Sequence, residues 1–215
     1  MLTSWLVAIW IILSLILSKK GQSYLLDFPL FIASVLLLSS NLGTYININL
    51  IKVDFLFVWG VIILWFYLRR KDLNLVWKLE DLFWGLVIGL GIGIFSISVF
   101  GTKSLLVNLD QNVSIITLSN ITIQKAAAEE FVFRLLLINY LRKFGIPDWI
   151  VNILQSVAFG VGHYSGFPSS LPRLLFAVVT GYIMGVLAIK QKSILSPMAI
   201  HIAINLLFLF FYLRS

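Results

Sequence analysis

Residues 82–100 read LFWGLVIGLGIGIFSISVF, a run of nineteen residues without a charged side chain. A helix of that length rises about 28 Å, close to the roughly 30 Å of hydrocarbon in a bilayer. Seven further apolar runs, each bounded by charge, proline or polar residues, lie on either side of it. The eight candidate spans are Leu2 to Ser18, Tyr24 to Ser40, Val53 to Leu68, Leu82 to Phe100, Ile123 to Leu141, Trp149 to His163, Pro172 to Ile189 and Ile194 to Leu213. The sequence therefore predicts an all-α fold, a polytopic transmembrane bundle of about eight helices.

The composition of the whole chain also indicates a membrane protein. Of its 215 residues 60% are hydrophobic and 12% are charged, whereas soluble domains have about 25% charged residues. No internal repeat or long linker divides the apolar segments, so we predict a single integral membrane domain over residues 1–215, surrounded by lipid. The chain has no cysteine, which excludes disulfides, thiolate zinc sites and thiol nucleophiles.

The basic residues are distributed as membrane topology requires. The net charge is +7, and Lys and Arg form short clusters between the apolar runs. If alternate spans end on the same side, one side collects ten of the sixteen basic residues, and the positive-inside rule makes that side cytoplasmic. These residues are Lys19, Lys20, Arg69, Arg70, Lys71, Lys78, Arg142, Lys143, Lys190 and Lys192. Topology thus accounts for the charge, and we expect no nucleic-acid partner.

Two of the predicted helices carry glycines at a spacing of four residues. Gly85, Gly89 and Gly93 share one helix, and Gly181 and Gly185 share another. Small residues at this spacing let the backbones of neighbouring membrane helices approach closely. We therefore predict a tight helix contact at each of these two faces.

Ionisable residues inside the apolar spans are few and concentrated in the second half of the chain. They include two of the three glutamates, Glu129 and Glu130, and both histidines, His163 and His201. An ionisable side chain in hydrocarbon costs a few kcal/mol even on the lenient insertion scales. Each of these four residues therefore needs a partner or a function.

Helical geometry gives the two adjacent glutamates different neighbours. Glu130 and Arg134 are four residues apart and share a face, which favours an ion pair, whereas Glu129 points away from Arg134. Glu129 is then available for another task. On a different span Asn205 lies one turn after His201, so both side chains can reach the same point in a central cavity.

Structural interpretations of the same residues stay open. The pair of Glu130 and Arg134 can be purely structural, since proteins retain such pairs without chemistry. Glu129 can pair with Lys125, which lies one turn earlier. A packing role for Glu129, the two histidines and Asn205 together is less favourable. Buried polar groups on three separate helices need hydrogen-bond partners, and contacts with one another satisfy them at the lowest cost in free energy.

In this order, these residues resemble the three motifs of the CPBP family, the CAAX prenyl protease type II and bacteriocin-processing (Abi) intramembrane endopeptidases. The motifs are a glutamate pair followed by an arginine, a phenylalanine with histidine four residues later, and a histidine with asparagine four residues later. The matching residues are Glu129, Glu130 and Arg134, then Phe159 and His163, then His201 and Asn205. The resemblance covers about residues 123–213, the predicted catalytic core.

The resemblance implies hydrolysis of a peptide bond by glutamate-activated water in a conical membrane cavity. Carried over to this sequence, Glu129 would be the general base. His163 would position the water or the scissile carbonyl, and His201 with Asn205 would stabilise the oxyanion. The supporting residues would be Glu130, Arg134 and Phe159.

A zinc-dependent intramembrane metalloprotease is the alternative mechanism, because the family has also been regarded as metalloproteases. One glutamate and two histidines are an acceptable zinc set, so a bound metal would be held by Glu129, His163 and His201. The sequence has no His-Glu-x-x-His helix, and the candidate ligands come from three helices. We therefore expect no metal cofactor, with zinc as the alternative.

Two non-proteolytic classes also stay open, a bacteriocin immunity protein without catalysis and a transporter. The intact Glu129, His163 and His201 disfavour the first, and the absence of repeated halves disfavours the second. As partners we expect a peptide or membrane-associated protein substrate and the lipid bilayer. The short, loop-poor chain is typical of a bacterial plasma membrane protein.

Overall fold

The computed structural model describes residues 27, 60, 63, 65–67, 75–101, 115–164 and 171–212. All regular structure within these ranges is helical, which confirms the all-α prediction for them. In chain order the elements are α4 (Leu79–Phe100), α5 (Ile115–Glu130), the π-helix η2 (Phe131–Leu137), α6 (Ile138–Arg142), α7 (Asp148–Tyr164), α8 (Leu171–Gln191) and α9 (Leu195–Tyr212). The predicted spans Leu2 to Ser18, Tyr24 to Ser40 and Val53 to Leu68 fall almost wholly outside the described residues.

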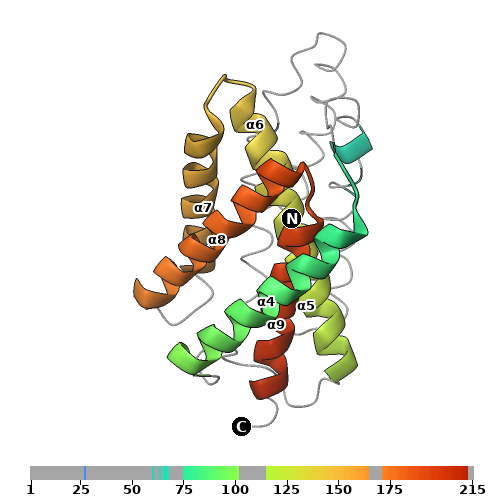
Figure 1. The fold of residues 1–215 in the computed structure, drawn as a ribbon, viewed down its shortest axis with the longest axis vertical. Helices are drawn as coiled ribbons and strands as arrows, with labels where there is room; N and C mark the ends of the chain where they lie inside the picture. Colours follow the sequence, from blue (N-terminus) through green and yellow to red (C-terminus); the bar gives the residue numbers. More distant parts are fainter. Residues whose placement is uncertain are drawn as a thin grey trace, which may run out of the picture.

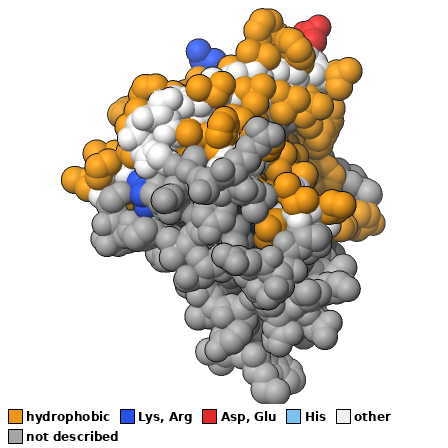
Figure 2. Space-filling view, turned by 90° about the horizontal axis from the view of Figure 1, so that it is seen from below, with side chains coloured by type: hydrophobic (Ala, Val, Ile, Leu, Met, Phe, Trp, Pro, Cys, Tyr) orange, Lys and Arg blue, Asp and Glu red, His pale blue; other side chains and the backbone are white. Residues whose placement is uncertain are grey.

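Of the described helices, α4 and α8 are long and apolar enough to cross a membrane. The number of about eight transmembrane helices therefore stays a prediction. The outer surface fits a lipid environment, because large hydrophobic side chains are exposed on several helices (Figure 2). On α4 these include Phe83, Trp84, Leu86, Val87, Leu90, Ile94, Phe95 and Val99.

Helix α9 connects the described elements. It packs against α4, α5 and α8, while α7 packs mainly on α8. Segments α5, η2 and α6 form one uninterrupted helical run, which rises through the bundle in Figure 1. This run begins at Ile115 rather than at the predicted Ile123, because α5 continues along α9 and buries Leu118.

The contact between α4 and α9 is built on the first set of glycines. A methyl group added at Gly85 would lie 2.6 Å from the carbonyl oxygen of Ser196, and one at Gly89 would lie 2.7 Å from the Cα of Ile200. The Ser196 hydroxyl donates a hydrogen bond of 2.6 Å to the backbone carbonyl of Asp81. The predicted close approach is confirmed, and the partner helix is the one that carries His201.

The second set of glycines accommodates polar side chains of α7. The Gln155 amide donates to Asn152 Oδ1 at 2.8 Å and to the carbonyl oxygen of Gly181 at 2.9 Å. The Asn152 amide donates to the carbonyl oxygen of Tyr182 at 3.1 Å. A side chain at Gly185 would overlap both amides. We call Asn152 and Gln155 the amide cluster; it holds α7, and therefore His163, against α8.

One end of the bundle gathers several of the basic residues assigned to the cytoplasmic side. The backbone N–H of Val76 donates to the carbonyl oxygen of Lys192 at 2.8 Å, so the starts of α4 and α9 are neighbours. The end of α6 is tied to the start of α7, where Arg142 Nε lies 2.7 Å from Asp148 Oδ1. This hydrogen bond lowers the pKa of the exposed Asp148 carboxyl below its ordinary value.

Candidate active site

The predicted site residues come from three parts of the described bundle that meet in its interior. Glu129 and Glu130 end α5, and η2 begins directly after them. The other residues are Arg134 in η2, Phe159 and His163 in α7, and His201 and Asn205 in α9. The π-helix was not foreseen from the sequence; irregular turns of this kind are frequent at functional sites.

Glu129 is buried and contacts both histidines. Its Oε2 lies 3.4 Å from His163 Nε2 and 3.5 Å from His201 Nε2. Its other oxygen, Oε1, lies 3.4 Å from Lys125 Nζ. The pairing with Lys125 that the sequence left open is therefore present together with the histidine contacts.

Glu130 joins the structural pair to the histidines. Its Oε2 lies 3.1 Å from Arg134 Nε, and both side chains are fully buried, as the i to i+4 spacing suggested. Its other oxygen lies 2.8 Å from His201 Nδ1. The sequence could not reveal this second contact, because it joins residues 71 positions apart. Glu130 thus fixes the orientation of the His201 ring.

Arg134 reaches the other histidine through an aromatic ring. Its guanidinium carbon lies 4.2 Å from the centre of the Phe159 ring, within the range of a cation–π contact. The Phe159 ring centre is in turn 4.2 Å from that of His163. Among the described residues the Arg134 nitrogens have no hydrogen-bond partner of good geometry, so the ion pair and the ring are their main neighbours.

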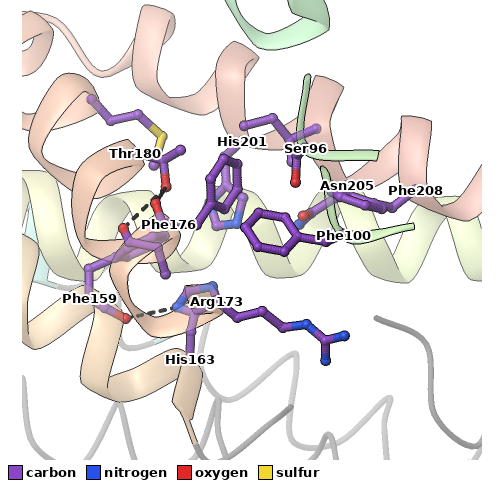
Figure 3. A pocket seen from close by; sticks show the side chains of 13 residues that line it. Ser96, Phe100, Phe159, His163, Arg173, Phe176, Thr180, His201, Asn205 and Phe208 are labelled. Carbon is purple, nitrogen blue, oxygen red and sulfur yellow. Dashed lines mark hydrogen bonds between the residues drawn. The ribbon is translucent and has the colours of Figure 1, made fainter. Parts of the chain in front are cut away.

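The partners of the two Nδ1 atoms determine what the Nε2 atoms present to Glu129. His163 Nδ1 lies 2.8 Å from the carbonyl oxygen of Phe159, which can only accept, so this nitrogen carries the hydrogen (Figure 3). By the same reasoning His201 Nδ1 donates to the Glu130 carboxylate. In a neutral imidazole, Nε2 then faces Glu129 with a lone pair.

Three hydrogen-bond acceptors therefore converge, one oxygen of Glu129 and the Nε2 atoms of His163 and His201. These ligand atoms lie within 4.8 Å of one another. Acceptors that face each other are stabilised by a donor or a cation between them. The arrangement suits a water molecule that donates to two of the three atoms. One glutamate and two histidines also form an acceptable donor set for zinc.

A pocket opens beside the histidines, with about 70 Å³ of space for water-sized molecules. His163, His201 and Asn205 line it, whereas Glu129 is not among the lining residues and contacts the pocket through the two histidines. The other described lining residues are Ser96, Phe100, Phe159, Arg173, Phe176, Ala177, Thr180, Met184, Ile204 and Phe208 (Figure 3).

Several pocket residues were not candidates from the sequence. Ser96 on α4 and Thr180 on α8 are hydroxyl residues in apolar runs, and such residues commonly bond to their own helix backbone. Thr180 does so, with its hydroxyl 2.8 Å from the carbonyl oxygen of Phe176. Arg173 lies in the first turn of α8. None of the three belongs to a motif.

The apolar outer faces and the buried polar site are features of a membrane-embedded protein with hydrolytic potential. Residues 111–207 match the family model described as type II CAAX prenyl endopeptidase, Rce1-like. The match spans less than half of the chain; over this segment it agrees with the resemblance inferred from the motifs, and it supports a membrane-embedded endopeptidase of the CAAX type in general. Neither the curated proteins nor the solved structures contain a match.

Proposed function

We propose that the protein is an intramembrane endopeptidase in which Glu129 activates water to hydrolyse a peptide bond. The family match supports proteolysis in general. The observation that carries the mechanism is the convergence of Glu129 Oε2 with the Nε2 atoms of His163 and His201 next to a pocket. A water molecule there donates to the carboxylate and to one imidazole, which orients its oxygen toward the pocket.

The first chemical step is attack of this water on the scissile carbonyl carbon. Glu129 accepts a proton from the water while the new carbon–oxygen bond forms, which yields a tetrahedral intermediate with an oxyanion. The Asn205 amide and, when doubly protonated, His201 Nε2 donate to that oxyanion. His201 keeps its Nδ1 contact to Glu130 throughout.

The second step breaks the carbon–nitrogen bond. The oxyanion reforms the carbonyl, and Glu129 returns its proton to the leaving amine, so the carboxylate is regenerated. The products are a new carboxyl terminus and a new amino terminus. In this scheme Glu130, Arg134 and Phe159 do not touch the reacting atoms; they orient His201 and His163.

The remaining assignments follow from this proposal. The substrate is a peptide or a membrane-associated protein that enters the pocket from the bilayer, and the enzyme requires no cofactor. The chain acts as one integral membrane domain over residues 1–215 with its catalytic core at about 123–213. Its location is the bacterial plasma membrane.

A zinc-dependent reaction is the second candidate, and specific observations favour it. Glu129, His163 and His201 can supply three ligand atoms within 4.8 Å, and each Nδ1 is bonded to an oxygen, as in many histidine ligands of zinc. A zinc ion held by these residues would serve as a Lewis acid. The metal-free mechanism is our proposal, because the Lys125 ammonium beside Glu129 already supplies a positive charge there.

Cleavage of hydrophobic peptides by the purified protein tests the proposal. We expect turnover by the native chain and a loss of about 10² to 10⁴-fold in Glu129→Gln, which keeps the shape and hydrogen bonding but removes the base. Glu80→Gln, at an exposed glutamate, is the matched control and keeps full activity. Normal turnover by Glu129→Gln refutes the mechanism.

The same assay separates the two candidates. We expect activity to resist a strong chelator and the purified protein to hold less than one metal ion per chain. Activity that collapses on chelation and returns with zinc assigns the same residues to a metalloprotease.

A further inference from the structure

The pocket next to the histidines contains a buried hydroxyl group that the proposed mechanism does not use. Ser96, near the end of α4, lines this pocket and is only 1% exposed. None of the residues that the structure describes is a hydrogen-bond partner of its hydroxyl. A hydroxyl in apolar surroundings costs free energy unless something bonds to it. This hydroxyl is therefore suited to a ligand that enters the pocket.

Two neighbouring hydroxyls show the alternative that Ser96 does not take. Thr180, which also lines the pocket, donates to the carbonyl oxygen of Phe176 in its own helix at 2.8 Å. Ser98, on the exposed side of α4, donates to the carbonyl oxygen of Ile94 at 2.9 Å. Hydroxyl residues in helices commonly satisfy their hydrogen bonding in this way. The Ser96 hydroxyl makes no such bond to α4 and remains available inside the pocket.

The packing of α4 on α9 brings Ser96 to the residue predicted to stabilise the oxyanion. The buried face of α4 continues from Gly93 to Ser96. Gly93 faces α9, since a methyl group added to it would lie 3.5 Å from the Cα of Ile204. Asn205 follows Ile204 in α9 and lines the same pocket. In Figure 3 the Ser96 hydroxyl points toward the Asn205 amide.

The two polar side chains share the pocket without bonding to each other. Within the described part of the chain, the Asn205 amide also has no hydrogen-bond partner. The pocket has about 70 Å³ of space for water-sized molecules, which leaves room for a carbonyl group. A hydroxyl donates one hydrogen and an amide two, and one carbonyl oxygen accepts from both because it has two lone pairs. Ser96 and Asn205 together therefore complement the carbonyl oxygen of a peptide.

We propose that Ser96 is a further catalytic residue, whose hydroxyl donates a hydrogen bond to the oxygen of the scissile carbonyl next to Asn205. This inference rests on the proposed function, because it takes the pocket as the place of hydrolysis. The hydroxyl keeps its proton, and no covalent bond to Ser96 forms or breaks. The hydrogen bond strengthens as the carbonyl oxygen becomes an oxyanion, so it lowers the barrier to attack by water.

Turnover by the purified full-length protein is the first test, with an internally quenched peptide whose core is Phe-Leu-Val-Leu-Phe. Ser96→Ala should lower kcat by roughly 10 to 100-fold with little change in KM, because the lost bond is strongest in the transition state. Ser98→Ala removes a hydroxyl from the exposed side of the same helix and is the matched control, with native kcat. Ser96→Cys keeps the volume but donates only weakly, so it should recover little of kcat.

Thermal unfolding separates this role from a structural one. Because the Ser96 hydroxyl has no partner among the described residues, Ser96→Ala should unfold at the temperature of the native chain or above it. A lower unfolding temperature in Ser96→Ala, with both stability and kcat restored in Ser96→Cys, assigns Ser96 to helix packing and overturns the proposal.

A tetrahedral analogue tests the contact with the oxyanion without cleavage. The probes are the acetylated and amidated peptide Phe-Leu-Val-Leu-Phe and the same peptide with a phosphonamidate in place of its Leu-Val bond. The native chain should bind the phosphonamidate at least about tenfold more tightly than the peptide, because its oxygens resemble those of the tetrahedral intermediate. Ser96→Ala should lose most of this preference and bind the peptide as the native chain does.

Three results overturn the proposal. They are native kcat in Ser96→Ala, full recovery of a lowered kcat by Ser96→Cys, and a phosphonamidate preference that is absent from the native chain or survives Ser96→Ala. Failure of the proposed function is a separate outcome. In that case the phosphonamidate preference depends on Ser96, but the native chain cleaves no peptide.

Discussion

Helix α7 carries two buried polar groups that serve different purposes. In its first half, the amide cluster of Asn152 and Gln155 donates hydrogen bonds within itself and to backbone carbonyls of α8. Near its other end, His163 presents an imidazole nitrogen to Glu129 beside the pocket. The amide cluster is neutral and buried between α7 and α8, whereas His163 contacts the charged Glu129 and lines the pocket.

The contrast shows which buried polar residues indicate chemistry. A side-chain donor that is paired with a backbone acceptor makes a helix contact specific, and it is no longer available to bind a ligand or a water molecule. Converging acceptors, as at Glu129, His163 and His201, retain the capacity to bind and polarise a small molecule. Removing a residue from the first group should therefore change stability, and removing one from the second should change activity.

The largest expected effect is at His163. His163→Ala should lower peptide turnover by about 10² to 10⁴-fold, because the water loses one of its positioning acceptors. The midpoint of thermal unfolding should hardly change, since the side chain is partly exposed and its truncation leaves no buried charge unpaired. A large fall in stability with normal activity per folded molecule would contradict the claim that His163 serves the reaction while the amide cluster serves stability.

The next largest effect concerns Arg134, which supports the site from within the core. Arg134→Met should lower the free energy of unfolding by about 3–5 kcal/mol, because the buried Glu130 carboxylate loses the guanidinium that neutralises it and keeps only its contact with His201. The folded yield from membranes measures this loss. Arg142→Met, which breaks an ion pair with exposed Asp148, is the control and should cost under about 1 kcal/mol. Normal accumulation with loss of activity alone would place Arg134 among the catalytic residues.

At the amide cluster we expect the opposite pattern. Gln155→Leu should lower the free energy of unfolding by about 1–3 kcal/mol, because Asn152 Oδ1 and the carbonyl oxygen of Gly181 lose their donor. Turnover per folded molecule should stay close to that of the native chain. Thermal unfolding and turnover are measured on the same preparation. Lost turnover at unchanged stability would make the amide cluster part of the catalytic machinery.

The smallest effect is expected at Lys125, which touches the far oxygen of Glu129. Lys125→Met should lower kcat by roughly tenfold with little change in KM, because the carboxylate loses a restraint on its orientation. Lys125→Arg keeps the charge and should recover most of kcat. Equal kcat in the native chain and in Lys125→Met would show that this ion pair has no part in the reaction.

Much of the fold could be predicted from the sequence, because a membrane helix is recognisable from a local run of apolar residues. The apolar run at residues 82–100 appears as α4, and its glycines identified a close helix contact, since a missing side chain has the same effect wherever the partner lies. The early start of α5 was missed because residues 115–122 are less apolar. Leu118 in this stretch is buried, and no local pattern records that packing.

The candidate site was accessible only in part, for a related reason. Glu130 and Arg134 are one turn apart, so helical geometry sufficed to pair them. The contact between Glu130 and His201 depends on how two distant helices pack, and the pattern of either helix alone does not contain it. Arg173 belongs to none of the three motifs, and its position in the pocket follows from the packing of α8.

The most direct test of the central claim compares the membrane peptidomes of cells that carry the native chain or Glu129→Ala. The account predicts a defined set of peptide fragments with the native chain, and loss of those fragments with accumulation of their precursors in the variant. Both chains must be present in the membrane at equal amounts, as an immunoblot shows. Identical peptidomes at equal abundance would contradict the claim that Glu129 is the base of an intramembrane peptidase.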